Sequence, residues 1–88
     1  MTAPAPGDDR LRRIRIRSWR RGTREMDLIL GGFVDAELAG LGPEALADLE
    51  RLLDEGDHDL YRWVAAPGAA PEGYRAIVER IQRHHRIR

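Results

Sequence analysis

Apolar residues recur at steps of three and four along most of the chain, and this spacing predicts five short helices. The strongest stripe lies between Thr23 and Leu41, where seven apolar side chains would share one helical face. The other expected helices span residues 10–20, 43–55, 57–65 and 72–85. Because the connections are short and no strand pattern is convincing, we predict an all-α fold, a small five-helix bundle.

The start of the chain differs from the rest in composition. Prolines and small residues without periodicity precede the first helix, so we expect a disordered leader over residues 1–8. Residues 9–86 would then form a single helical domain. Helix-boundary residues support this division: Asp8 or Asp9 as the first N-cap, Pro43 opening the third helix, Gly56 closing it, and Asp57 or Asp59 capping the fourth.

Two glycines interrupt the strongest stripe. Gly31 and Gly32 should each cost up to about 1 kcal/mol relative to alanine in a helix, and we expect the close approach of another helix backbone to offset that cost. In the first helix, the apolar positions Leu11, Ile14, Ile16 and Trp19 fit helical spacing only partly, because Ile14 and Ile16 are two residues apart, a spacing that would also suit a short strand.

Charge is distributed unevenly along the chain. The formal net charge is zero, but residues 1–25 carry +5, residues 26–60 carry −9 and residues 61–88 carry +4. This asymmetry favours recognition of a partner through charged surfaces. The chain has no cysteine, which excludes a disulfide framework and a thiol nucleophile, and no apolar run is long enough to span a bilayer. We therefore expect a cytoplasmic protein that makes no membrane contact.

Catalytic and metal-binding patterns are missing from the sequence. The three histidines are His58, beside a helix start, and the adjacent His84 and His85, which point about 100° apart on a helix and do not match metal-ligand spacing. No nucleophile motif or nucleotide-binding fingerprint is present. We expect neither an enzyme, nor a metal site, nor a tightly bound cofactor.

A basic N-terminal arm offers an alternative interpretation. Eight arginines among the first 25 residues and an aromatic ring at Trp19 are the groups that bind phosphates and stack on bases. The neutral total charge and the lack of a recognition helix argue against nucleic-acid binding. A small nucleic-acid-binding or antitoxin-like regulator remains the alternative hypothesis.

One short segment combines groups suited to docking a partner protein. Arg21, Gly22 and Glu25 place a planar donor, a bare backbone and an acceptor close together at the start of the most periodic helix. An exposed Arg21–Glu25 ion pair would be the simpler role, but arginine before glutamate is the less favourable order on a helix. Tyr61 and Trp63 lie in a second notable segment, where an aromatic residue is more often part of the core than an anchor for a partner.

These two segments together resemble a known family. Arg20-Arg21-Gly22-Thr23-Arg24-Glu25-Met26-Asp27 is similar to the first signature of the succinate dehydrogenase flavinylation factors, and Asp57-His58-Asp59-Leu60-Tyr61-Arg62-Trp63 resembles the second. The resemblance covers roughly residues 10–85. It implies a five-helix assembly factor that binds the flavoprotein subunit of succinate dehydrogenase, and in some members that of fumarate reductase.

The resemblance also implies how such a factor acts and where. It promotes covalent attachment of FAD to a histidine of the client, and the FAD belongs to the client, not to the factor. By matching positions, the residues at the client interface would be Arg20, Arg21, Gly22, Glu25 and Asp27. Secondary candidates for the partner surface are Asp59, Tyr61 and Trp63.

Overall fold

The structure, a computed structural model, describes residues 6–86, with side chains from Asp9 onward. This part of the chain contains no strand and folds into five α-helices and one short 3-10 helix. The predicted all-α, five-helix fold is confirmed. The elements are α1 (Pro6–Trp19), α2 (Arg24–Glu37), η1 (Leu38–Gly40), α3 (Pro43–Leu52), α4 (Asp57–Ala65) and α5 (Glu72–His85).

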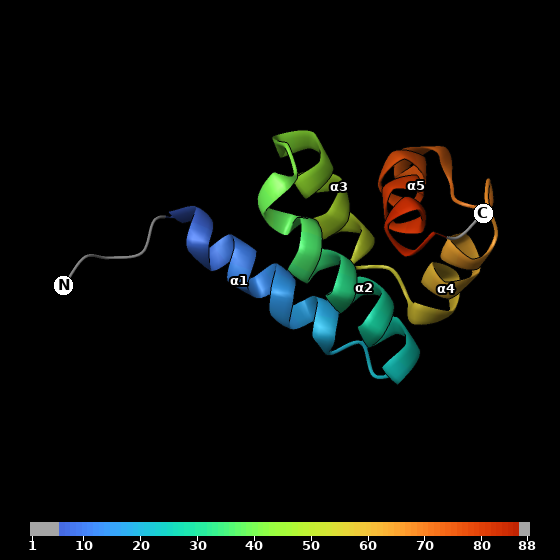
Figure 1. The fold of residues 1–88 in the computed structure, drawn as a ribbon, viewed down its shortest axis with the longest axis horizontal. Coiled ribbons are helices and arrows are strands. Elements are labelled where there is room, and N and C mark those ends of the chain that lie inside the picture. The colour runs from blue at the N-terminus through green and yellow to red at the C-terminus, as the bar shows by residue number, and fades with distance from the viewer. Residues whose placement is uncertain (1–5, 87–88) are drawn as a thin grey trace.

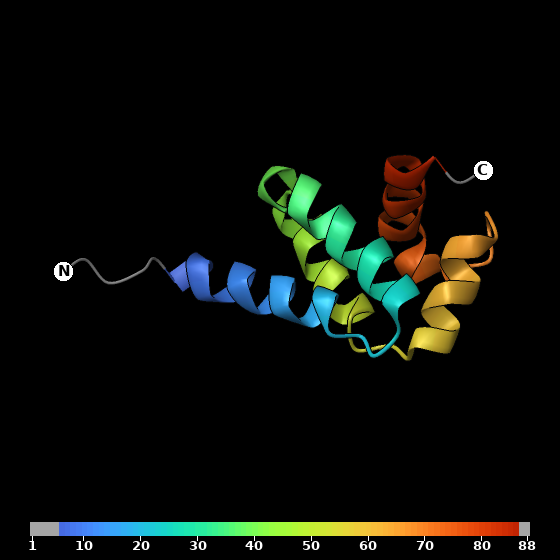
Figure 2. The same ribbon diagram turned by 60° about the horizontal axis from the view of Figure 1, so that its bottom comes forward.

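The helices form two connected groups, one of α1, α2 and α3 and the other of α4 and α5 (Figure 1). α2 turns back alongside α1 after a short loop, and this pair makes the most extensive helix contact in the described chain. α5 packs against α2, α3 and α4 and so joins the two groups. The first turns of α1 extend beyond the other helices, which leaves one side of α1 open to solvent (Figure 2).

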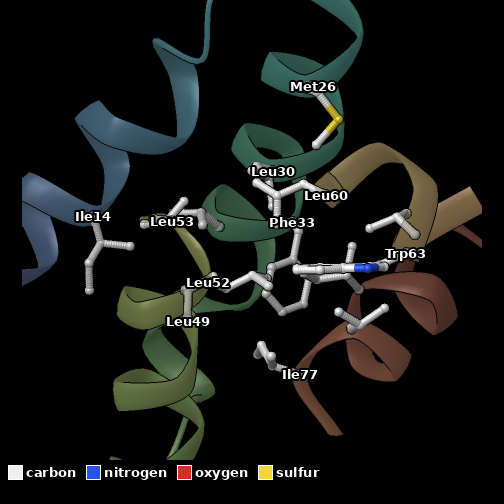
Figure 3. Packing of buried hydrophobic residues seen from close by; sticks show 14 of the residues in the cluster. Ile14, Met26, Leu30, Phe33, Leu49, Leu52, Leu53, Leu60, Trp63 and Ile77 are labelled. Carbon is white, nitrogen blue, oxygen red and sulfur yellow. The ribbon is translucent and has the colours of Figure 1, made fainter. Parts of the chain in front are cut away.

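The core runs through the centre of the bundle. Phe33 of α2, Leu52 of α3 and Trp63 of α4 meet there, and Ile14 is the one fully buried apolar residue that α1 contributes (Figure 3). Two polar residues are buried with hydrogen bonds. The Ser18 hydroxyl donates to the Ile14 carbonyl at 2.7 Å, and the Gln82 amide donates to the Trp63 and Val64 carbonyls at 3.2 and 3.0 Å. The Gln82 hydrogen bonds tie α5 to the end of α4.

An aromatic side chain, and not the expected helix backbone, lies against Gly31. A Cβ added at Gly31 would lie 2.3 Å from the Trp19 ring, so the indole rests directly on the α2 backbone. The Trp19 Nε1 also donates to Asp35, one turn further along α2, at 3.2 Å. Gly32 is different, because its added Cβ would meet only His85, at an ordinary contact of 3.7 Å.

Helix α1 differs from the expectation at its start and on its surface. It begins at Pro6, four residues early, because proline fits the first turn of a helix, where its missing N–H is harmless. Asp8 and Asp9 therefore lie inside the helix and do not cap it, and of the expected leader only residues 1–5 lie outside the described residues. Ile16 is 43% exposed and does not face the core.

The ends of α2 and α3 also differ from the predicted boundaries. The apolar stripe of α2 continues past Glu37, but η1 carries it, and Leu38 stays buried. α3 ends at Leu52 and not at residue 55, and Gly56 has φ of −71°, so it caps the start of α4 and does not end α3. The bounds of α4 and α5 match the predicted ranges.

We predict that Gly31→Ala destabilises the protein by about 1–3 kcal/mol, because the new methyl group must displace the Trp19 ring from α2. Gly32→Ala is the matched control, since its methyl group has room and gains helix propensity. Urea unfolding followed by circular dichroism measures both free energies. Equal or higher stability of Gly31→Ala relative to Gly32→Ala would contradict the packing of Trp19 on Gly31.

Candidate partner-binding site

The loop between α1 and α2 is shaped by three residues of the first motif. Gly22 has φ of +99°, in the left-handed region that favours glycine, and an added Cβ would have no neighbour within 4 Å. Thr23 then caps α2, and its hydroxyl accepts from the Met26 N–H at 3.3 Å. The Asp27 carboxylate reaches back to the Arg21 N–H at 2.7 Å. The loop is therefore tied at both ends, with bare backbone at its tip.

The Arg21 side chain points into the molecule. Its Nε donates to the Asp57 carboxylate at 2.8 Å, and its two Nη atoms donate to the carbonyls of Leu53 and Glu55. The side chain is only 11% exposed. All three guanidinium nitrogens are thus engaged within the chain, at the point where α3 ends and α4 begins. A planar, bidentate donor group is what this set of acceptors requires.

A groove lies between the first turns of α2 and α4, where the two motifs meet. It has a volume of about 310 Å³. Glu25 stands on one wall and Tyr61 on the other, and both side chains are exposed. The lining residues are Thr23, the N-cap of α2, Glu25 and Met26 from α2, and Asp57, His58 and Tyr61 from α4.

The residues expected at the client interface divide into two groups. Arg20, Gly22 and Glu25 are exposed, whereas Arg21 and Asp27 make contacts inside the chain. The described residues contain no Arg21–Glu25 ion pair, because Arg21 turns toward α4. The first motif therefore combines residues that hold the loop with residues that face solvent.

The second set of candidates divides in the same way. Trp63 is 7% exposed and stacks on Tyr74, with ring centroids 5.6 Å apart, so it belongs to the core. The pKa of the Tyr74 hydroxyl is raised mainly by partial burial and secondly by the negative charge of Glu55. Tyr61 is 44% exposed in the groove, and Asp59 pairs with Arg62 at 3.2 Å on the surface of α4.

Four lining residues were not among the sequence candidates. They are Thr23, Met26, Asp57 and His58, and all four lie inside the two motifs, so taking every residue of each motif as a candidate would have found them. The other histidines have structural contacts. His84 lies 2.9 Å from Glu37, and His85 lies 2.7 Å from the Ile29 carbonyl. Among the described residues no group of three or more histidine, aspartate or glutamate side chains is placed to hold a metal ion.

Fold and site together define a small helical bundle that presents a partly aromatic groove, apolar over most of its surface and built from two helix starts. Residues 12–85 match the family described as flavinator of succinate dehydrogenase, and the chain belongs to this family. The resemblance drawn from the two motifs is confirmed.

Curated relatives from bacteria and fungi support this membership. The chain is 38% identical over 63 residues to the FAD assembly factor SdhE of Acetobacter pasteurianus, a match that covers 72% of this chain and 58% of the relative. It is 43% identical over 61 residues to the mitochondrial succinate dehydrogenase assembly factor 2 of Aspergillus terreus, a match that covers 69% of this chain and 20% of the relative. The corresponding protein of Schizosaccharomyces pombe is 30% identical over 89 residues, a match that covers 92% of this chain and 64% of the relative.

The chain thus spans less than two thirds of the length of each of these relatives. A comparison with solved structures gave no match. Within residues 6–86, no helix combines the length and the apolar character needed to cross a membrane.

We predict that Arg21→Ala lowers the free energy of unfolding by about 2–3 kcal/mol, because two carbonyls and a carboxylate lose a charged donor in a largely desolvated place. Arg21→Lys should recover only part of this loss, since an ammonium group cannot reach three acceptors in the plane of a guanidinium. Arg20→Ala is the control, because Arg20 is the exposed neighbour and its loss should change stability by less than about 0.5 kcal/mol.

Urea unfolding of the three variants measures these differences. A stability of Arg21→Ala equal to that of Arg20→Ala would show that Arg21 does not hold the loop against α4.

Proposed function

We propose that this chain is an assembly factor that binds the flavoprotein subunit of succinate dehydrogenase and promotes the covalent attachment of FAD to it. Membership of the flavinator family supports the proposal, as do the names of the relatives in three organisms. The observation that carries it for this chain is the meeting of both motifs at one exposed groove.

The groove supports a binding role through the residues that it leaves available. Glu25 and Tyr61 are exposed, and among the described residues Glu25 forms no ion pair. A carboxylate and an aromatic face on opposite walls can receive polar and cationic groups of a partner. The open Gly22 backbone beside the groove lets a partner approach closely.

Arg21 and Asp27 contribute indirectly in this proposal. They hold the loop, so the positions of Gly22 and Glu25 relative to α4 are set before the partner arrives. A preorganised surface loses less conformational entropy on binding. The factor would then select the client conformation in which histidine and flavin meet, and thereby act by positioning while the client and its FAD supply the chemistry.

We predict that Gly22→Arg abolishes most of the covalent flavin gained on co-expression with the flavoprotein subunit. The new side chain covers the open backbone and forces a non-glycine residue into φ of +99°. In-gel flavin fluorescence of the client measures the covalent FAD.

Gly68→Arg provides a matched control. Gly68 also has positive φ, at +81°, and open space around its Cβ position, but it lies in the loop that follows α4, whereas Gly22 adjoins Thr23 of the groove lining. The backbone strain is thus similar, while the proposed contact is untouched. Equal covalent flavin with both variants would contradict the assignment of the site.

A further inference from the structure

Exposed apolar side chains gather along the line where α1 meets α2. In the part of the chain that the structure describes, four large apolar side chains are exposed: Ile16, Trp19, Leu28 and Tyr61. Tyr61 belongs to the groove. The other three lie on α1 (Ile16 and Trp19) and on α2 (Leu28), within one helical turn of the point where the Trp19 ring contacts Gly31, and we call them the α1–α2 seam. Ile16 and Trp19 are three residues apart on α1, a spacing that places them on one face.

Leu28 joins the seam from the other helix. It lies three residues before Gly31, on which the Trp19 indole rests, so the ring and Leu28 are neighbours on the surface of α2. Leu28 is 51% exposed, the highest value of the three. It also follows Glu25 by three residues, so the seam begins one helical turn from the groove.

The Trp19 ring is held in place although it is 40% exposed. Its flat contact with Gly31 and the hydrogen bond from Nε1 to Asp35 fix the orientation of the indole. An aromatic ring that is already ordered loses little entropy when a partner covers it. Tryptophan in such a position is typical of the residues that dominate the binding energy of protein interfaces.

Exposed arginines surround the seam. Arg12 and Arg15 lie one turn before Ile16 and Trp19, and Arg24 lies one turn before Leu28; all three form no ion pair within residues 9–86. The arginines on the opposite side of α1 behave differently. Arg10 pairs with Glu50 of α3, and Arg17 pairs with Asp54 in the turn that follows α3.

We propose that the α1–α2 seam is a second docking surface, and that it binds a segment of the flavoprotein client in which acidic residues flank an apolar side chain. The proposal rests on the proposed function for the identity of the partner. Charge complementarity selects the acidic flanks. Four exposed arginines around the seam (Arg12, Arg13, Arg15 and Arg24) form no ion pair within residues 9–86, whereas three carboxylates (Asp9, Glu25 and Asp35) lie beside it. The apolar centre selects a protein partner, since Ile16 and Leu28 offer nothing to a phosphate backbone.

Binding of the purified flavoprotein subunit to the full chain tests the seam by biolayer interferometry. We expect Ile16→Glu and Leu28→Glu each to weaken binding roughly tenfold or more, because each places a carboxylate in the apolar centre and against the acidic segment. Ala47→Glu is the control, since Ala47 is exposed on α3, away from the seam, and should bind as the wild type does. Arg12→Gln with Arg15→Gln should slow association and weaken its dependence on salt.

Fluorine NMR gives an independent measurement with an internal control. In protein labelled with 5-fluorotryptophan, Trp19 and Trp63 are the only two signals. The Trp19 signal should shift when the flavoprotein subunit is added, whereas the Trp63 signal should remain near its original position, because Trp63 is buried in the core.

The outcomes separate the inference from the proposed function. If the wild type binds and the seam variants bind equally well, the seam is not a docking surface, and the groove alone carries binding. If the wild type does not bind the flavoprotein subunit, both proposals fail. Binding of duplex DNA by the wild type that Arg12→Gln with Arg15→Gln removes would overturn the inference in favour of a nucleic-acid surface.

Discussion

The Arg21 guanidinium is the interaction on which the arrangement of the site depends. It joins the α1–α2 loop to the turn between α3 and α4, more than thirty residues away in sequence. Helix ends leave carbonyl groups without partners inside the helix, and Arg21 supplies donors to two carbonyls beyond the end of α3. The same group neutralises Asp57 at the start of α4. One side chain therefore sets the separation of the two helix starts that form the groove.

This arrangement gives the first motif two tasks. Arg21 and Asp27 face inward and fix the loop, and Gly22 and Glu25 face outward. Within this short motif, the inward residues fix the shape of the surface, and the outward residues supply its exposed groups. Under the proposed function, loss of either kind weakens partner binding for a different physical reason: an inward substitution lowers stability, whereas an outward substitution removes a contact. The two effects are separable by measuring folding and binding on the same variant.

Local sequence signals predicted much of the fold and part of the site. The bounds of α4 and α5 follow from the turn residues around them, and the stripe in α2 follows from its apolar spacing. The early end of α3 was not predicted, and the Leu53 and Glu55 carbonyls beyond it accept hydrogen bonds from Arg21, a residue distant in sequence. Gly31 shows the same limit: the sequence predicts the close approach of another helix backbone, whereas the Trp19 ring lies against this glycine. The direction of Arg21 was equally hidden, since an arginine beside an exposed glycine has no local feature that turns it inward.

Hydrogen–deuterium exchange of this chain, alone and bound to the flavoprotein subunit, tests the central claim most directly. We expect slower amide exchange in the α1–α2 loop and in the first turns of α2 and α4, where the groove and the open Gly22 backbone lie. We expect little change along α3 and in the loop between α4 and α5. Protection confined to α3 and to that loop, with unchanged exchange around Gly22, Glu25 and Tyr61, would contradict it.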